Sequence, residues 1–435
     1  MVVLLKIIQV ILAISLLILI HELGHFTFAK IFKIRVEKFY LFFDIGGKAL
    51  FKFKPKNSDT EYGIGWLPLG GYCKISGMVD ESMDTEALKQ EPKPWEMRTK
   101  PAWQRLLVMA GGVLYNFIFA ILLYISILAI WGESYISNEG NDIYVNELAY
   151  DMGFRSGDHI IRFDDYVPEK FGMLQADMAR QTASKATVLR NGDTLDIYLD
   201  QSRIGEVLNT PGMFDLAVPF VIDTIPPVSP NYGSELSKGD RIIGIDGNSV
   251  AYVQDSRKIL SSFAGKEVPV TVVRDEDTLA MELQVDSTGR LGVYTDYPEF
   301  KTKEYGVLEA VPAGLKLTFS TIGGYLQDLK LVFTPSTEAY KSVGSFISIG
   351  QIFPAKWNWY QFINILALLS IMLGVMNLIP IPGLDGGHIV FLLYEMITRR
   401  KPGEKFLIAA QAVGMILLFG LMILAFGNDI MRLIR

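Results

Sequence analysis

The stretch LLILIHELGHFTFAK, residues Leu16 to Lys30, places two histidines and a glutamate at the end of an apolar segment. Residues four positions apart share one face of a helix, so His21 and His25 point the same way, with Glu22 beside them. This spacing lets two imidazoles bind one zinc ion while the glutamate accepts a proton from water. Ionisable groups within a membrane helix usually serve a function, which favours a metal site over histidines bonded to neighbouring helices.

The apolar residues are concentrated in four segments, each near the length of about 20 residues that a membrane-crossing helix requires. Half of the residues are hydrophobic. We predict transmembrane helices over residues 1–30, 105–131, 361–382 and 405–427. A cleaved signal peptide is the alternative for the first, but the apolar segment continues directly into the histidines, which favours a retained helix.

Charge and cysteine content give no support for a nucleic-acid-binding protein or for a secreted protein stabilised by disulfides. The net charge of -6 gives no electrostatic reason to expect a nucleic-acid partner, and the single cysteine, Cys73, rules out a disulfide within the chain. Lysine and arginine are abundant in the connections 31–104 and 383–404. Short basic connections stay on the cytoplasmic side, so the long region between residues 132 and 360 is expected outside the membrane.

This long region contains an internal repeat. GFRSGDHIIRFDD begins at Gly153 and ELSKGDRIIGIDG begins at Glu235, and each copy precedes a hairpin-like alternating pattern. A Gly-Asp turn followed by a strand with two isoleucines resembles PDZ domains, although two generic small β domains are the alternative. We predict PDZ-like α+β domains over residues 132–215 and 216–300, followed by an amphipathic helical segment over 301–360 that lies on the membrane surface or packs as an ordinary helix.

A third metal ligand is expected from MNLIPIPGLDGGH, residues Met376 to His388. Its prolines and glycines must interrupt the helix, and broken backbone at membrane depth is tolerated only where it is buried or lines a wet cavity. Asp385 is the only carboxylate near this break, which makes it the candidate ligand. His388 is the rival ligand, and a loop or capping role is the structural alternative for Asp385.

Together, HELGH in the first span and NLIPIPGLDGG in the third resemble the site-2 protease family of intramembrane zinc metalloproteases, in particular its members with tandem PDZ domains. GWLPLGGYCKISG, from Gly65, resembles the family's re-entrant β-hairpin within the loop 31–104. MAGGVLYNF, ending near Asn116, resembles its second-span motif. The resemblance covers nearly the whole chain.

The resemblance implies a polytopic α-helical membrane protein in which His21, His25 and Asp385 bind Zn²⁺ and Glu22 is the general base. Contacts to the substrate are expected from residues of the second span, the third span and the hairpin: Asn116, Asn377, Gly70 and Gly71. For the two asparagines, hydrogen bonding between helices is the alternative.

The implied substrate is a single-span membrane protein, namely an anti-sigma factor already trimmed outside in an envelope stress response; signal-peptide remnants are further implied substrates. The implied location is the bacterial inner membrane, with the PDZ-like domains in the periplasm and the active site toward the cytoplasm. Two other hypotheses remain: a protease of the same chemistry acting on a different precursor, and a membrane-held PDZ adaptor with a structural zinc.

Overall fold

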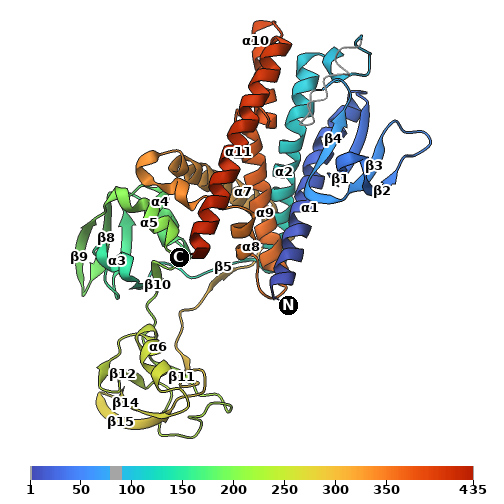
Figure 1. The fold of residues 1–435 in the computed structure, drawn as a ribbon. Helices are drawn as coiled ribbons and strands as arrows, with labels where there is room; N and C mark the ends of the chain where they lie inside the picture. Colours follow the sequence, from blue (N-terminus) through green and yellow to red (C-terminus); the bar gives the residue numbers. More distant parts are fainter. Residues whose placement is uncertain (1, 79–90, 435) are drawn as a thin grey trace. The chain divides into compact units, whose positions relative to one another are not determined.

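The computed structural model describes residues 2–78 and 91–434 of the chain; residues 79–90 of the predicted loop 31–104 lie outside the described residues. The chain forms two compact units (Figure 1). One unit comprises Met1–Glu133, Glu304–Lys330 and Val343–Arg435, and the other comprises Ser134–Lys303 and Leu331–Ser342.

Among the described residues, the first unit contains four helices that are long and apolar enough to cross a membrane. They are α1 (Val2–Ile31), α2 (Ala102–Trp131), α9 (Trp359–Leu378) and α11 (Glu404–Ile434). An α-helix satisfies its backbone polar groups internally, as a lipid environment requires. These helices correspond to the four predicted spans, and the prediction of a polytopic membrane protein is confirmed at that level.

Small residues allow α1 and α2 to cross closely. A Cβ atom placed on Gly24 would lie 2.1 Å from the carbonyl oxygen of Gly111, so neither helix tolerates a side chain at this point. Close backbone approach through glycine is a common way of packing membrane helices, where dispersion contacts replace the hydrophobic effect. On its other face α2 packs against α9 through Ala120, Ala367 and Ile371.

The third span breaks as its sequence predicts, and the connection predicted over residues 383–404 contains a helix that the sequence analysis did not anticipate. Helix α9 ends at Leu378, the backbone turns through residues 379–384, and α10 (Asp385–Thr398) begins immediately. Gly383 has a φ of +103°, a conformation that L side chains rarely adopt. The prolines and glycines of this turn therefore change the direction of the chain, and a new helix begins directly after them.

The predicted β-hairpin at Gly65 is also corrected by the structure. The segment forms one strand, β4, whose partner is β1, about thirty positions earlier in the chain, rather than a hairpin partner within the segment. The four-stranded sheet has the order β2-β3-β1-β4, which leaves β4 at an edge. Its strands are β1 (Val36–Phe43), β2 (Ala49–Phe53), β3 (Glu61–Gly65) and β4 (Leu67–Ile75).

The predicted amphipathic segment 301–360 contains two helices, α7 (Val307–Val332) and α8 (Phe346–Ile352). Leu317, Ile322 and Tyr325 of α7 pack against the core shared by α2 and α9, so this helix has a packed face. Leu308 and Phe319 of the same helix are 87% and 66% exposed. Helix α7 therefore packs against the core, as expected for an ordinary packing helix, and it also has exposed apolar side chains.

The second unit contains two modules, each with its own hydrophobic core. The first is built from β6 (Ile143–Val145), α3 (Glu147–Asp151), β7 (His159–Phe163), α4 (Leu174–Arg180), β8 (Lys185–Arg190), β9 (Asp193–Tyr198), α5 (Ile204–Asn209) and β10 (Phe214–Leu216). The second is built from β11 (Ile222–Thr224), β12 (Arg241–Ile245), β13 (Asn248–Ser249), α6 (Val253–Ser262), β14 (Glu267–Arg274), β15 (Asp277–Gln284) and β16 (Tyr294–Thr295). The short strands β5 (Glu133–Tyr135) and β17 (Lys301–Lys303) pair with each other.

The sequence repeat corresponds to repeated interactions in the two modules. Asp158 is fully buried and accepts two hydrogen bonds from Arg190, at 2.6 and 2.8 Å. In the second module Asp240 is equally buried and accepts two from Arg274, at 2.6 and 2.7 Å. Each aspartate thus anchors the turn before the first sheet strand to the hairpin that follows, which explains why both copies contain the aspartate of the Gly-Asp pair.

Candidate metal centre

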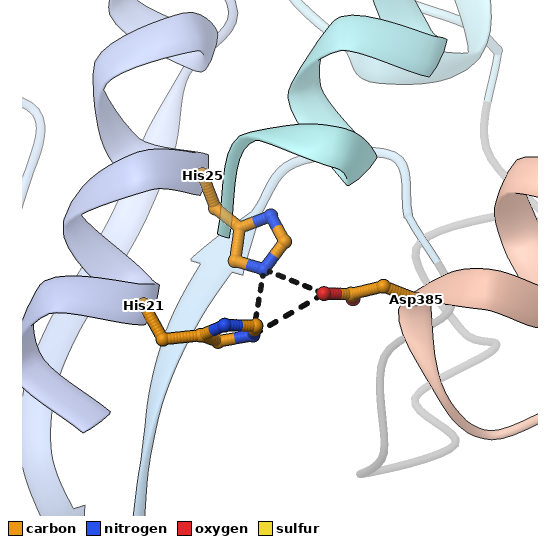
Figure 2. A group of neighbouring side chains, drawn as sticks. All are labelled: His21, His25 and Asp385. Carbon is orange, nitrogen blue, oxygen red and sulfur yellow. Dashed lines mark hydrogen bonds and ion pairs between the residues drawn. The ribbon is translucent and has the colours of Figure 1, made fainter. Parts of the chain in front are cut away.

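Three side chains from two helices converge at the break in the third span (Figure 2). His21 and His25 occupy successive turns of α1, and only 9% and 7% of their surfaces are exposed. Asp385 is the first residue of α10. Its Oδ2 atom lies 3.2 Å from His21 Nε2 and 3.3 Å from His25 Nε2, and the two Nε2 atoms are 3.2 Å apart.

This triangle has the dimensions of a tetrahedral metal site. Zinc binds imidazole nitrogen and carboxylate oxygen at about 2.0–2.1 Å, so two ligand atoms of a tetrahedral site lie about 3.3 Å apart. Among residues 2–78 and 91–434, His21, His25 and Asp385 are the group whose ligand atoms are close enough to share one ion. His388, the rival ligand in the sequence, is not part of that group.

The hydrogen bonding of His25 supports the same conclusion. Its Nδ1 atom lies 2.8 Å from the backbone carbonyl oxygen of Val108, and because a carbonyl can only accept, Nδ1 carries the hydrogen and donates it. When the ring is neutral, its Nε2 atom therefore carries the lone pair, and this atom faces the centre of the triangle. A lone pair beside a carboxylate oxygen is an arrangement that a cation stabilises, and a carbonyl partner on the other ring nitrogen is typical of metal-bound histidine.

Helix α2 packs directly against the two histidine rings. A Cβ atom on Gly112 would lie 2.5 Å from His25 Nε2 and 2.6 Å from Cε1 of His21, so only glycine leaves room for both rings. One turn further along α2, Asn116 is fully buried, and its Nδ2 atom lies 3.1 Å from His21 Nδ1. Residues 108, 112 and 116 therefore form one face of α2 against the two histidines.

The other predicted site residues surround the triangle on different sides. The carboxylate of Glu22 faces the backbone amide of Cys73 in the edge strand β4. The side-chain nitrogen of Asn377, in the last turn of α9, lies 3.5 Å from His21 Nε2, the atom that faces the centre of the triangle. Asn377 therefore lies on the ligand side of the ring, whereas Asn116 lies behind it.

Gly70 and Gly71 allow β4 to approach its neighbours. A Cβ atom on Gly71 would lie 2.7 Å from Ile18 of α1, and one on Gly70 would lie 2.5 Å from the ring of Phe43. Gly71 thus allows the edge strand to lie against the helix that bears the histidines, whereas Gly70 makes room for Phe43 of β1. The predicted contact of these two glycines with the substrate would form at the edge of β4 that pairs with no strand among the described residues.

Two glycines after Asp385 explain how the carboxylate is positioned. A Cβ atom on Gly386 would lie 2.3 Å from the carbonyl oxygen of Ile379, and one on Gly387 would lie 2.7 Å from that of Ile381. The first turn of α10 therefore packs tightly against the turn that precedes it. This packing fixes the direction in which α10, and with it Asp385, begins.

Sequence reasoning did not identify the Val108 carbonyl or Ser370. The first is a backbone group, so no residue type at position 108 could have indicated it. The hydroxyl of Ser370 donates a 2.8 Å hydrogen bond to the backbone carbonyl of Asn116, and it is fully buried. A serine within an apolar helix was a detectable signal, but its partner could not be inferred without the packing of α9 on α2.

Comparison with known proteins agrees with the class that the apolar helices and the metal-ligand triangle define, namely membrane proteins with a buried metal centre. The model of peptidase family M50 matches residues 9–421, and the chain belongs to that family. A protein of Xylella fastidiosa (strain Temecula1 / ATCC 700964) named "Putative zinc metalloprotease" is 30% identical over 443 residues, covering 96% of each chain. The regulator of sigma-E protease RseP of Escherichia coli (strain K12) is 28% identical over 458 residues, covering 97% of this chain and 98% of that protein.

Proposed function

We propose that the chain is a zinc metalloendopeptidase that cleaves single-span membrane proteins within the bilayer. The observation that supports this most directly is the triangle of His21, His25 and Asp385, with ligand atoms 3.2–3.3 Å apart at the broken end of an apolar helix. We assign these three residues as zinc ligands. When bound there, zinc polarises a carbonyl group and makes water acidic enough to act as a nucleophile near neutral pH.

Glu22 is the general base in this proposal. It follows His21 directly on α1, so its carboxylate lies beside the ligand set without belonging to it. Glu22 accepts the proton of the attacking water and then delivers a proton to the leaving amine, as general acid–base catalysis requires. The role agrees with that of the glutamate in other H-E-x-x-H sites.

The substrate must be unwound before it can be cleaved, because a helix keeps its amides bonded internally. The edge strand β4, which contains Gly70 and Gly71, has one side free of strand pairing among the described residues. An extended substrate segment adds to this edge by β-augmentation, beside Glu22. Asn377, on the ligand side of His21, provides an amide that holds the unwound backbone.

The natural substrate in this proposal is an anti-sigma factor that another protease has already trimmed outside the membrane. This follows the similarity to RseP, whose name describes a regulator of sigma-E. The two modules of the second unit act as PDZ-like domains in the periplasm and exclude substrates that retain an intact ectodomain. The enzyme lies in the inner membrane with its site toward the cytoplasm, because the basic connections flank that side.

The deciding experiment replaces Glu22 with Gln in the full-length protein, reconstituted with a fluorogenic single-span substrate. We expect kcat to fall by about 10²–10⁴-fold, the usual contribution of general acid–base catalysis, while one zinc per chain is retained. Thr27→Ala, five positions further along the same helix, is the matched control and should cleave at the wild-type rate. Cleavage by Glu22→Gln at the full rate would refute the mechanism, and zinc binding without cleavage by the wild type would favour the adaptor hypothesis.

A further inference from the structure

We propose that Asn116 is a positioning residue for the metal centre, which holds the His21 ring by accepting a hydrogen bond from Nδ1 through its side-chain oxygen. The proposal rests on the proposed zinc site and assigns Asn116 a role other than the substrate contact expected from the sequence. It follows from three features of the structure: the direction of the His21 ring, the unpaired oxygen of the amide, and the burial of the asparagine.

The direction of the ring determines which nitrogen carries the hydrogen. His21 Nε2 lies 3.2 Å from both Asp385 Oδ2 and His25 Nε2, so this nitrogen faces the metal position. A neutral imidazole that binds a metal through Nε2 has its hydrogen on Nδ1, where it needs an acceptor. The partner of His21 Nδ1 in the described structure is the side-chain amide of Asn116, 3.1 Å away.

The amide of Asn116 has an acceptor that is not otherwise used. Its Nδ2 faces the ring, while its Oδ1 is buried with no hydrogen-bond partner within the described part of the chain. The two ends of a carboxamide are similar in size, so a half-turn about the Cβ–Cγ bond brings Oδ1 to Nδ1 in the same space. Metal binding through Nε2 requires this orientation, because Nδ2 and a protonated Nδ1 would be two donors facing each other.

The packing of Asn116 suits a positioning role and excludes direct access. The residue is fully buried, and its backbone carbonyl also accepts a hydrogen bond from Ser370 of α9. It is therefore held between α1 and α9, behind the ring and away from the side on which Asn377 lies. The proposed bond resembles the one made by the other histidine, because His25 Nδ1 donates a hydrogen bond to the Val108 carbonyl oxygen two turns earlier on α2.

The test measures zinc affinity rather than activity, on the full-length protein in detergent with a competing chelator. Asn116→Leu has a similar size but no acceptor, and we expect its zinc dissociation constant to rise about 10–100-fold, as for other outer-shell partners. Asn116→Asp restores an acceptor and should bind zinc within about tenfold of the wild type by the same reasoning. Ser126→Ala, at an exposed position ten residues further along α2, is the matched control and should retain wild-type affinity.

The outcomes separate this proposal from its alternatives. Wild-type zinc affinity in Asn116→Leu overturns it, and a raised KM with unchanged zinc affinity shows a substrate contact instead. Equal weakening in the Leu and Asp variants shows a packing role and also overturns it. If the wild type binds no zinc, the proposed function fails as well, which is a different result from zinc binding that is insensitive to Asn116.

A second measurement avoids the variants, in case Asn116→Leu does not fold. The chain has four histidines, so ¹⁵N-histidine labelling of the zinc-loaded wild type gives a spectrum that can be assigned. We expect both His21 and His25 to bind zinc through Nε2, each with a protonated Nδ1. Coordination of His21 through Nδ1 would contradict the proposal.

Discussion

At the scale of single residues, the candidate metal centre consists of an aspartate and two histidines, residue types whose side chains can bind zinc. The sequence analysis singled out all three, and the structure brings them together; the role of Glu22 stays a prediction. It could not choose between Asp385 and His388 by position alone, because they are three residues apart. The structure groups Asp385 with the histidines, since α10 begins at that residue and directs its carboxylate toward α1.

Replacing each candidate ligand tests this choice. We expect Asp385→Ala to lower zinc affinity by more than 100-fold. A residue that binds zinc directly contributes more than a residue that only orients a ligand, whose loss typically lowers metal affinity 10–100-fold. His388→Ala is the matched control and should bind one zinc as the wild type does. Zinc content of the purified proteins, measured by mass spectrometry after dialysis, gives the answer. Retained zinc in Asp385→Ala with loss in His388→Ala would reverse the assignment.

At the scale of secondary-structure elements, the sequence predicted features that depend on local pattern. The four apolar helices, the break after Leu378 and the hairpin that follows the first copy of the repeat all follow from nearby residues. It did not predict α10 or the pairing of β4 with β1. The breakers before Asp385 suggested a loop, and strand partners far apart in the chain are chosen by packing that no local pattern records.

The contact between α1 and α2 leads to a prediction about Gly112. A methyl group there would meet both histidine rings, so Gly112→Ala must push the helices apart or rotate the rings. We expect kcat/KM to fall about 10²-fold, the effect of a misplacement of about 1 Å at a reacting centre. Gly420→Ala in α11, where a Cβ atom meets nothing within 4 Å, is the matched control. Equal activity of both variants would show that the crossing is not tightly packed.

The second module should be sensitive to acid through Asp240. The Arg274 guanidinium holds the pKa of Asp240 below its usual value of 3.8. A carboxyl whose pKa is lowered by folding contributes stability above its unfolded pKa, and that stability is lost as the pH falls through the lower folded value. We therefore expect amide-exchange protection of β12, corrected for intrinsic rates, to decrease below about pH 4.

The variant Arg274→Ala tests the cause of this acid sensitivity. Without the guanidinium the folded pKa of Asp240 should no longer be depressed, so the decrease in protection attributable to this pair should disappear. Lys238→Ala removes an exposed partner of Asp223 and is the matched control. The explanation fails if wild type and Arg274→Ala lose protection to the same extent between pH 6 and pH 3.

At the scale of the whole molecule, the proposed orientation can be tested with single-cysteine proteins. The native Cys73 is the only cysteine, so Cys73→Ser gives a background without thiols. We expect a cysteine introduced at Lys54 to react only after the cytoplasmic side is opened. A cysteine at Val228, which is 93% exposed in the second unit, should react from outside in intact cells. The opposite pattern would place the active site toward the periplasm.

The metal centre also has a consequence for how the protein is made. The two imidazoles are synthesised before the carboxylate, because Asp385 follows His25 by 360 positions. At about 5–20 residues per second, a ribosome adds the carboxylate roughly 20–70 s later. Until then the ligand set proposed here is incomplete, and the proposed hydrolysis cannot take place. In the proposed mechanism, a product truncated before Asp385 is inactive for the same reason, so proteolytic competence is acquired only after this residue has been added.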